Sequence, residues 1–259
     1  GIEAVFEKWK NMDSAALLSN LQKNTELKNV LLRETPWVLD AQDENQQKKN
    51  LGLLFDMIRM NKELKSALDK LSMMQSEAGG FPWFKGGRDD RYITQYIISG
   101  IGHLKKLNAV PETEKAVLDQ IVKTAIAYLD KEIKKDYDNR PKKEAENISP
   151  MQVQYLYMRS FFPGTGLPCA AFPAMNYYRK RALQYWPKQN MYLRGMIALF
   201  LYRTGDHKAE KDILASLKEN ATISEDQGMY WKTVQPGYYW TESPVETQSL
   251  LIEAFNEIG

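Results

Sequence analysis

The sequence has few of the residues that most often bind metals or act as nucleophiles. Its 259 residues include one cysteine, Cys169, and two histidines, His103 and His207. A single cysteine excludes a disulfide within the chain, and these three residues lack the paired spacing of a zinc site. There is also no Gly-x-Ser-x-Gly turn and no phosphate-binding glycine loop. We therefore expect no metal, no cofactor and no catalytic activity, with Cys169 as a small packing residue.

The chain also lacks long hydrophobic runs and an excess of charge. Lysine and arginine number 35 against 33 acidic residues, for a net charge of +2. This balance argues against a nucleic-acid partner, and the densest basic cluster, 179–181, is interpreted as a solvated helix face. No run reaches the ~20 apolar residues of a membrane span, and residues 1–10 do not resemble a signal peptide. Since the sequence begins with Gly1 and not with a methionine, we expect it to be an internal piece of a larger protein.

Strand patterns are nearly absent, whereas helical periodicity is found throughout the sequence. One class of predicted helix is apolar along one side and charged on the other, as at 61–75, 111–137 and 206–219. A second class is apolar nearly all round, as at 91–107, 150–162 and 190–203, with 244–258 less extreme. Helices that are apolar all round belong in the interior, and one-sided helices belong at the surface.

Capping residues support the starts of three interior helices. These residues are Ser149 and Pro150 with Gln152, Ser243 and Pro244 with Glu246, and Asp89 or Asp90 before Arg91.

Alternation of the two classes predicts an all-α fold of helical hairpins, with inner apolar helices and outer amphipathic helices. Such hairpins form either an open solenoid or a closed α/α toroid. The inner helices begin near residues 91, 149, 190 and 244, which is too uneven for a regular solenoid. We therefore expect a single α/α-toroid domain over residues 1–259.

Three loops between helices, at 79–90, 162–168 and 228–240, are rich in glycine, proline and aromatic residues. We expect them to turn sharply over the ends of the inner helices, and their aromatic side chains to close the core. A binding surface is compatible with the same placement. The candidate interface or groove residues are Trp83, Phe84, Arg88, Asp89, Asp90, Tyr230, Trp231, Tyr238, Tyr239 and Trp240.

Two of these loops, with the helix starts that follow them, resemble a known family. The runs are Gly79-Gly80-Phe81-Pro82-Trp83-Phe84 before Asp89-Asp90-Arg91-Tyr92-Ile93-Thr94-Gln95-Tyr96, and Tyr238-Tyr239-Trp240 before Val245-Glu246-Thr247-Gln248. They are similar to the thioester-region toroid of bacterial α2-macroglobulin-like proteins. Upstream, Glu34-Thr35-Pro36-Trp37 and Leu53-Leu54-Phe55-Asp56 resemble the Bacteroides-type version.

The resemblance implies a large periplasmic or cell-surface protein, commonly membrane-anchored, that traps proteases as an endopeptidase inhibitor. This domain would be non-catalytic, would dock against other domains of the same protein, and would shield a reactive segment. The implied partners are those domains and target proteases. The family's Cys-x-Glu-Gln thioester motif is missing, because Cys169 is followed by Ala170 and Ala171. No thioester residue is therefore assigned in this chain.

Two alternatives remain open. Toroids also carry glycosidases, which need two facing carboxylates. Asp89 and Asp90 with Glu242 or Glu246 could supply them, although Asp89, Asp90 and Glu246 also suit helix capping. A helical-repeat adaptor is the other alternative, disfavoured by the uneven repeat length.

Overall fold

A computed structural model describes residues 57–259, apart from 142–145, 226–227, 233–236 and 238. By its contacts the chain divides into two compact units, Gly1–Lys70 and Leu71–Gly259, and each is described by itself. The upstream motifs at 34–37 and 53–56, together with Tyr238, lie outside the described residues. The single domain predicted over 1–259 stays a prediction for the same reason.

The described part is mostly helical, as the sequence predicts. Every predicted helix is present, with ends that differ by a few residues. The α-helices are α6 (Met57–Met74), α7 (Arg91–Lys106), α8 (Lys115–Asp138), α9 (Pro150–Ser160), α10 (Phe172–Tyr185), α11 (Met191–Arg203), α12 (Ala209–Glu219) and α13 (Pro244–Ile258). Short 3₁₀ turns are η1 (Glu112–Glu114), η2 (Cys169–Ala171), η3 (Trp186–Lys188) and η4 (Trp240–Glu242). Of the first unit, the structure describes the part of α6 that ends at Lys70.

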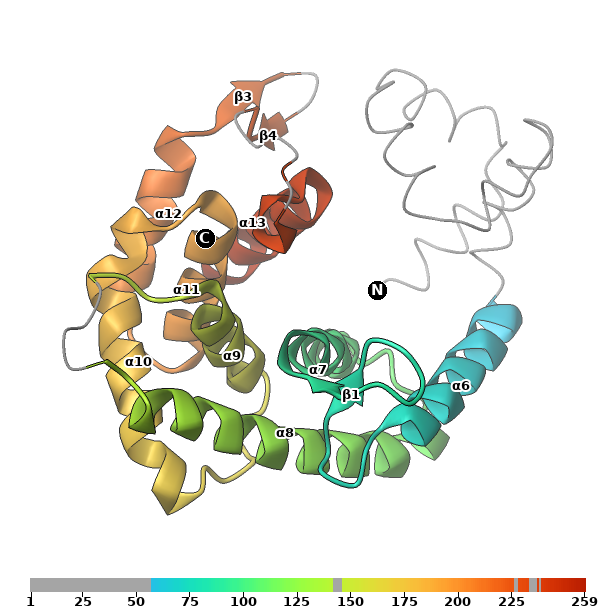
Figure 1. Ribbon diagram of the computed structural model, residues 1–259. Coiled ribbons are helices and arrows are strands. Elements are labelled where there is room, and N and C mark those ends of the chain that lie inside the picture. Colours follow the sequence, from blue (N-terminus) through green and yellow to red (C-terminus); the bar gives the residue numbers. More distant parts are fainter. Residues whose placement is uncertain (1–56, 142–145, 226–227, 233–236, 238) are drawn as a thin grey trace, which may run out of the picture. The chain divides into compact units, whose positions relative to one another are not determined.

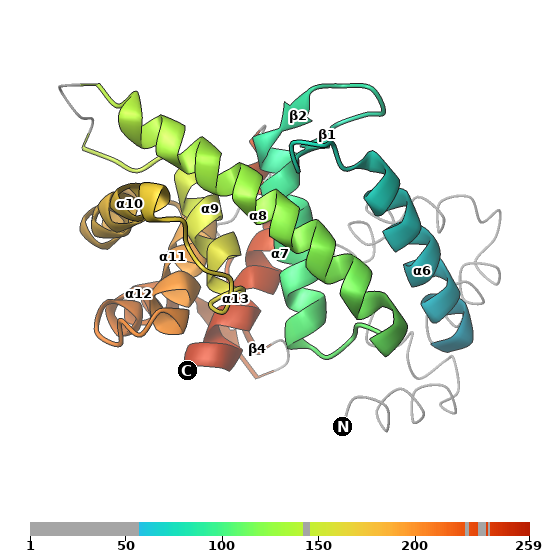
Figure 2. The ribbon, with the colours of Figure 1, turned by 90° about the horizontal axis from the view of Figure 1, so that it is seen from below.

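Within the second unit the helices lie in two layers. Helices α7, α9, α11 and α13 pack against one another in that order and form the inner row (Figure 1). On the outer side, α8 packs on α7 and α9, α10 packs on α8 and α9, and α12 packs on α11 and α13. Figure 2 shows the long helix α8 running across both α7 and α9. The inner row therefore connects the two ends of the unit through α9 and α11.

For most helices, the observed burial matches the class predicted from the sequence: inner helices are buried on both faces, and outer helices on one. Helix α9 buries every residue from Val153 to Ser160, and α11 buries both of its faces. Helix α8 buries a stripe at the spacing of one helix face, formed by Leu118, Ile121, Val122, Ala125, Ile126, Leu129 and Ile133. Removing this apolar surface from water supplies the main stabilisation of the unit, at roughly 25 cal/mol per Å².

The two helices at the ends of the inner row are less buried than the sequence predicts. Tyr96 of α7 is 48% exposed and Ile252 of α13 is 63% exposed. Each of these helices packs against one inner neighbour, α9 or α11, whereas α9 and α11 have an inner neighbour on both sides. The prediction that α7 is covered all round is wrong for this reason.

Two of the three predicted caps form as expected. The Asp90 carboxylate accepts a hydrogen bond from the backbone N–H of Ile93 at 2.9 Å, which fixes the start of α7. The backbone N–H of Ser149 donates to Gln152 Oε1 at 3.1 Å. At α13, by contrast, the Ser243 side chain makes no capping hydrogen bond. The predicted capping box there is wrong, because Glu246 accepts a hydrogen bond from Tyr192 of α11 instead.

Two of the loops contain short strands that the sequence did not indicate. Strand β1 (Phe81–Pro82) pairs antiparallel with β2 (Asp89–Asp90), and β3 (Thr222–Ser224) pairs with β4 (Gly228–Tyr230). Gly79 makes the sharp turn before β1 with φ of 96°, and a Cβ at Gly79 would lie 2.3 Å from the Thr124 carbonyl oxygen. Both the turn and the close approach therefore require glycine.

The second predicted loop is fixed by a buried ion pair. The Arg159 guanidinium donates to the Asp130 carboxylate at 3.2 Å, and Tyr155 donates to the same carboxylate at 2.7 Å. Arg159 also donates to the carbonyl oxygens of Thr165 at 2.9 Å and Gly166 at 3.1 Å. Burial raises the pKa of Asp130, while the hydrogen bond from Tyr155 and the charge of Arg159 act in the opposite direction. The buried pair thus holds the loop over the end of α9.

Two glycines of α7 test how this helix packs against Phe161 at the end of α9. The same substitution, to alanine, should have opposite effects on stability at the two positions. A Cβ at Gly100 meets no atom within 4 Å, so Gly100→Ala should raise the free energy of unfolding by about 0.5–1 kcal/mol. A Cβ at Gly102 would lie 2.5 Å from Phe161 Cγ, so Gly102→Ala should lower the free energy of unfolding by about 1–3 kcal/mol. Urea denaturation measures both, and equal shifts of the same sign would contradict the packing of α7 on Phe161.

Candidate functional site

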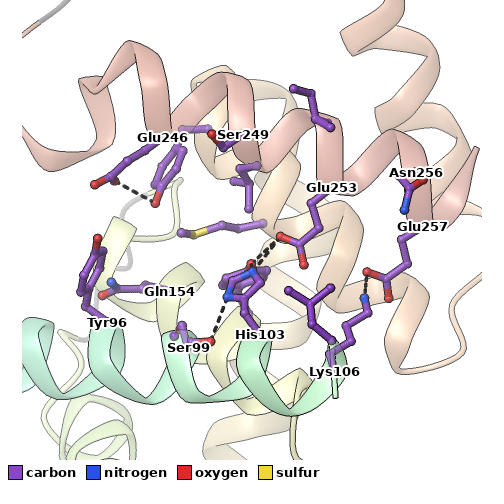
Figure 3. A pocket seen from close by; sticks show the side chains of 17 residues that line it. Tyr96, Ser99, His103, Lys106, Gln154, Glu246, Ser249, Glu253, Asn256 and Glu257 are labelled. Carbon is purple, nitrogen blue, oxygen red and sulfur yellow. Dashed lines mark hydrogen bonds and ion pairs between the residues drawn. The ribbon is translucent and has the colours of Figure 1, made fainter. Parts of the chain in front are cut away.

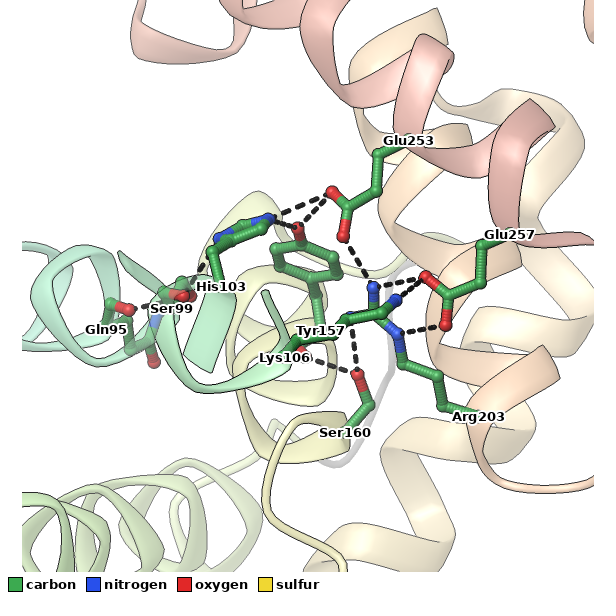
Figure 4. A network of polar contacts seen from close by, with 9 residues as sticks. All are labelled: Gln95, Ser99, His103, Lys106, Tyr157, Ser160, Arg203, Glu253 and Glu257. Atoms are coloured by element: carbon green, nitrogen blue, oxygen red, sulfur yellow. Dashed lines mark hydrogen bonds and ion pairs between the residues drawn. The ribbon is translucent and has the colours of Figure 1, made fainter. Parts of the chain in front are cut away.

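The inner helices meet at a cluster of charged side chains around Glu253 of α13 (Figure 4). Glu253 Oε2 lies 3.0 Å from His103 Nε2 and accepts a hydrogen bond from the Tyr157 hydroxyl at 2.9 Å. Glu253 Oε1 accepts from Arg203 Nη2 at 2.6 Å. His103 belongs to α7, Tyr157 to α9 and Arg203 to α11, so one carboxylate joins all four inner helices.

The hydrogen-bond partners of His103 come from three inner helices. Its Nδ1 lies 2.9 Å from the Ser99 carbonyl oxygen, which can only accept, so Nδ1 carries a proton. Its Nε2 lies 3.0 Å from Glu253 Oε2 and 3.0 Å from the Tyr157 hydroxyl, and that hydroxyl is itself 2.9 Å from Glu253 Oε2. His103, Tyr157 and Glu253 therefore form one hydrogen-bonded group.

Glu253 stays ionised in spite of its burial. Burial alone would raise its pKa, but the hydrogen bond and charge of His103, followed by the charge of Arg203, lower the pKa to about 2. Arg203 also binds Glu257, with Nε 3.0 Å from Oε1 and Nη2 2.7 Å from Oε2, and Lys106 forms a further ion pair with Glu257. These contacts hold the pKa of Glu257 below its ordinary value. The cluster thus contains its own counter-ions.

A pocket of about 630 Å³ extends from this cluster between the inner helices. Its apolar walls include Met196 of α11 and Leu250 of α13. Figure 3 shows Glu246 and Tyr96 at one end, Lys106 and Glu257 at the other, and His103 with Glu253 between them. A pocket of this size, apolar with a few convergent polar groups, is typical of small-ligand sites.

A cluster of aromatic rings next to Tyr192, which lines the pocket, connects two of the predicted loops. Tyr92 stacks on Trp83 of the first loop at 6.0 Å between ring centroids, and lies 5.0 Å from Trp240 of the third loop. Tyr192 of α11 meets Trp240 edge-on at 6.0 Å. The first and third loops, far apart in sequence, therefore contribute to one aromatic cluster.

Five of the predicted interface residues, all in the first and third loops, are exposed or half-buried. Trp83 is 64% exposed, Phe84 is 70% exposed and Tyr239 is 66% exposed. Arg88 is also exposed, and Trp240 is half-buried. Of these, Trp83 and Trp240 share Tyr92 as a ring neighbour.

Trp231 does not belong to the exposed set, and its expected place at a docking face is wrong. It is buried, its indole Nε1 donates to the Leu217 carbonyl oxygen at 2.8 Å, and its ring lies 5.6 Å from Phe255. A tryptophan that satisfies its N–H inside the protein is part of the core. Tyr230 beside it is half-buried, and Tyr238 lies outside the described residues.

The acidic residues considered for catalysis have separate structural contacts. Asp89 accepts a hydrogen bond from Ser76 at 2.7 Å, and Asp90 caps α7. Glu242 accepts from the backbone N–H of Tyr239 at 3.3 Å. Glu246 differs from these three in that it lines the pocket.

Cys169 is exposed in η2, so its expected role as a packing residue is wrong. In the residues that the structure describes, no group of three or more His, Cys, Asp and Glu side chains is arranged to hold a metal ion. Over the same residues, no helix combines the length and apolar character needed to cross a membrane.

The cluster around Glu253 was missed by sequence reasoning. The sequence does contain a weak indication of this cluster. Glu253 and Glu257 are one turn apart on a largely apolar helix, and Arg203 ends another such helix. Charged residues at such positions need a partner, but the sequence does not say which.

No protein-family model matches the chain, and no curated protein matches it. The resemblance to α2-macroglobulin-like proteins therefore depends on the motifs of the sequence.

Glu253→Gln tests the central cluster. Its pKa of about 2 lies below the ordinary 4.5, so its stabilising contribution is present above pH 4.5 and is lost as the pH falls through 2. At pH 7 the variant should lose roughly 3 kcal/mol of unfolding free energy, from about 1.4 kcal/mol per pKa unit.

Urea denaturation of both proteins between pH 7 and pH 2 measures this difference. The exposed Glu219 of α12 provides the control, and Glu219→Gln should change stability by less than about 0.5 kcal/mol. A Glu253→Gln effect that is the same at every pH would contradict the ionised state of Glu253.

Proposed function

We propose that this chain is a non-catalytic helical domain of an α2-macroglobulin-like protease-trapping protein. The observation that carries the proposal is the joining of the first and third loops into one exposed aromatic face. These loops contain the same motifs on which the resemblance rests. We assign to this face Trp83 and Trp240, which share Tyr92 as a ring neighbour, and the exposed residues Phe84, Arg88 and Tyr239 that adjoin them in the sequence or the loop.

The arrangement of the helices supports the closed toroid of this family. Inner helices, of which α9 and α11 are buried on both faces, alternate with outer helices such as the one-sided α8 along the second unit. The His103–Glu253 pair connects the first and last inner helices of that unit across the pocket. We propose that this array is part of an α/α toroid of helical hairpins.

The exposed aromatic face supports docking to another domain of the same protein. Large aromatic side chains provide most of the binding energy at protein interfaces, and arginine is also enriched there. In the proposed role, the face packs on a neighbouring domain and shields a reactive segment. The protein would work in the periplasm or at the cell surface, and its further partners would be target proteases.

A carbohydrate-active enzyme has less support. Such an enzyme needs two carboxylates that face each other across a groove. Asp89, Asp90 and Glu242 each accept a hydrogen bond from their own loop or helix start, which gives each of them a structural role.

A trapping assay on the full-length protein that contains this chain tests the proposal. A trapped protease should still cleave a small peptide substrate but should no longer cleave a large protein substrate. Methylamine incorporation then reports separately whether a thioester takes part. Failure to protect the large substrate from any protease would contradict the proposed function.

In the same assay, Trp83→Ala with Phe84→Ala should reduce trapping by about tenfold or more, because two interface anchors are removed. Phe172→Ala is the matched control, since Phe172 is 56% exposed but lies on outer helix α10. Equal effects of the two variants would contradict the assignment of the docking face.

A further inference from the structure

A chain of hydrogen bonds that begins at Arg91 orients the buried amide of Gln154. Arg91 Nε donates to Gln95 Oε1 at 3.1 Å, so the Nε2 group of Gln95 faces the other way. This Nε2 donates to the Met151 carbonyl oxygen at 3.1 Å and to Gln154 Oε1 at 2.7 Å. Because Oε1 is the acceptor in this pair, Gln154 Nε2 stands on the other side of the amide as a donor with two hydrogens.

Gln154 Nε2 has no hydrogen-bond acceptor among the residues that the structure describes. The side chain is 2% exposed and lines the pocket between the inner helices, so a partner for Nε2 has to come through the pocket (Figure 3). A water molecule can accept this hydrogen bond, and an oxygen atom of a ligand can replace the water. A ligand without an acceptor would instead leave the donor unsatisfied, which weakens binding.

The other buried polar side chains of the pocket use their hydrogens within the protein. The hydroxyl of Ser99 donates to a backbone carbonyl oxygen of α7 at 2.8 Å. The hydroxyls of Tyr157 and Tyr192 each donate to a glutamate of α13, at 2.9 and 3.4 Å. Among the described residues that line the pocket, Gln154 is therefore the buried side chain that still offers a donor.

The basic side chains that line the pocket, within the described part of the chain, both contact carboxylates. Lys106 forms an ion pair with Glu257, and His103 Nε2 lies 3.0 Å from Glu253 Oε2. An anionic ligand would have to compete with these carboxylates for its counter-ion. The acceptor oxygen of the ligand should therefore belong to a neutral group, such as the carbonyl of an amide.

Apolar walls provide room for an alkyl chain beside this donor. Met196 and Leu250 line the pocket and are nearly fully buried. Gly100 leaves one wall without a side chain, because a Cβ at this position meets no atom within 4 Å. The volume of about 630 Å³ lies in the range of small-ligand pockets. Burial of alkyl surface against these walls would supply binding energy, and the Gln154 amide would supply selectivity.

We propose that this pocket binds an apolar group that carries a neutral amide carbonyl. The carbonyl oxygen accepts from Gln154 Nε2, and the alkyl part lies against Met196 and Leu250. The site does not depend on the proposed protease-trapping function. Its ligand is either a small amide or a peptide segment of apolar residues, since both present the same carbonyl.

Titration of the whole chain, followed by protein-observed NMR, tests the site with defined probes. N-methylhexanamide should bind. Hexylammonium, which has no acceptor, and hexanoate, which is an anion, should each bind at least about tenfold more weakly. N-acetyl-leucyl-leucine-N-methylamide probes a peptide source. Tighter binding of this peptide identifies a peptide segment as the ligand, and tighter binding of N-methylhexanamide identifies a small amide.

Two variants separate binding from folding. Gln154→Glu keeps the acceptor for Gln95 but removes the donor, so N-methylhexanamide should bind about tenfold more weakly and hexylammonium more tightly than in the unmodified chain. A purely structural role of Gln154 would not invert this preference. The exposed Gln120 of α8 provides the control, and Gln120→Glu should leave both affinities unchanged.

Gly100→Leu should fill the pocket and weaken the binding of N-methylhexanamide. Its thermal midpoint should be unchanged or raised, because α7 loses a helix-interior glycine. No binding of either amide probe at millimolar concentration overturns the proposal. So does binding of N-methylhexanamide no tighter than that of hexylammonium or hexanoate, or unchanged amide affinity in folded Gln154→Glu or Gly100→Leu.

Discussion

The Glu253 carboxylate is the point at which the four inner helices of the second unit are joined. It accepts from Tyr157 of α9 and Arg203 of α11 and lies beside Nε2 of His103 of α7, at distances of 2.6 to 3.0 Å. A buried charge is tolerated where its partners are in place, and it destabilises the fold strongly where one partner is lost. This requirement fixes the positions of the four helices relative to one another. Apolar packing alone would leave the exposed sides of α7 and α13 less constrained.

Polar contacts also attach each loop to the inner row. A polar side chain of an inner helix binds the backbone of the adjoining loop. The hydroxyl of Thr94 accepts from the N–H of Phe81 at 2.8 Å, and Arg159 holds the carbonyl oxygens of the second loop. Gln248 binds both the N–H and the carbonyl oxygen of Trp231, at 3.3 and 2.8 Å. The exposed aromatic residues are therefore carried by loops that are each tethered to an inner helix, whereas the pocket is lined by the inner helices themselves.

Local features of the fold were predictable from the sequence. Helical periodicity located the α-helices, and the position of Asp90 located the start of α7. The short range of these interactions explains the success, since a cap acts on a backbone N–H three residues away. The glycines before β1 likewise indicated a sharp turn, although not the short hairpin that follows it.

Features that depend on which helices become neighbours were not predictable. His103 and Glu253 are 150 residues apart in sequence, and neither residue carries a local signal for the other. The exposure of Tyr96 arises because α7 is at the end of the inner row, and the burial of Trp231 arises because Leu217 and Phe255 approach it. The pocket exists only as a product of these long-range contacts. Sequence reasoning therefore located the aromatic loops but not the pocket between the inner helices.

The central claim is that His103 and Glu253 form a directly contacting pair that joins the ends of the inner row. A double-mutant cycle with His103→Gln and Glu253→Gln measures their coupling in the free energy of unfolding. The structure predicts a coupling of about 1–3 kcal/mol, because each residue is left without its partner in the single variants. The exposed pair of Glu112 and Lys115 is the reference, with an expected coupling below about 0.5 kcal/mol. Additive effects at His103 and Glu253, with coupling no larger than that of the reference pair, would contradict the account.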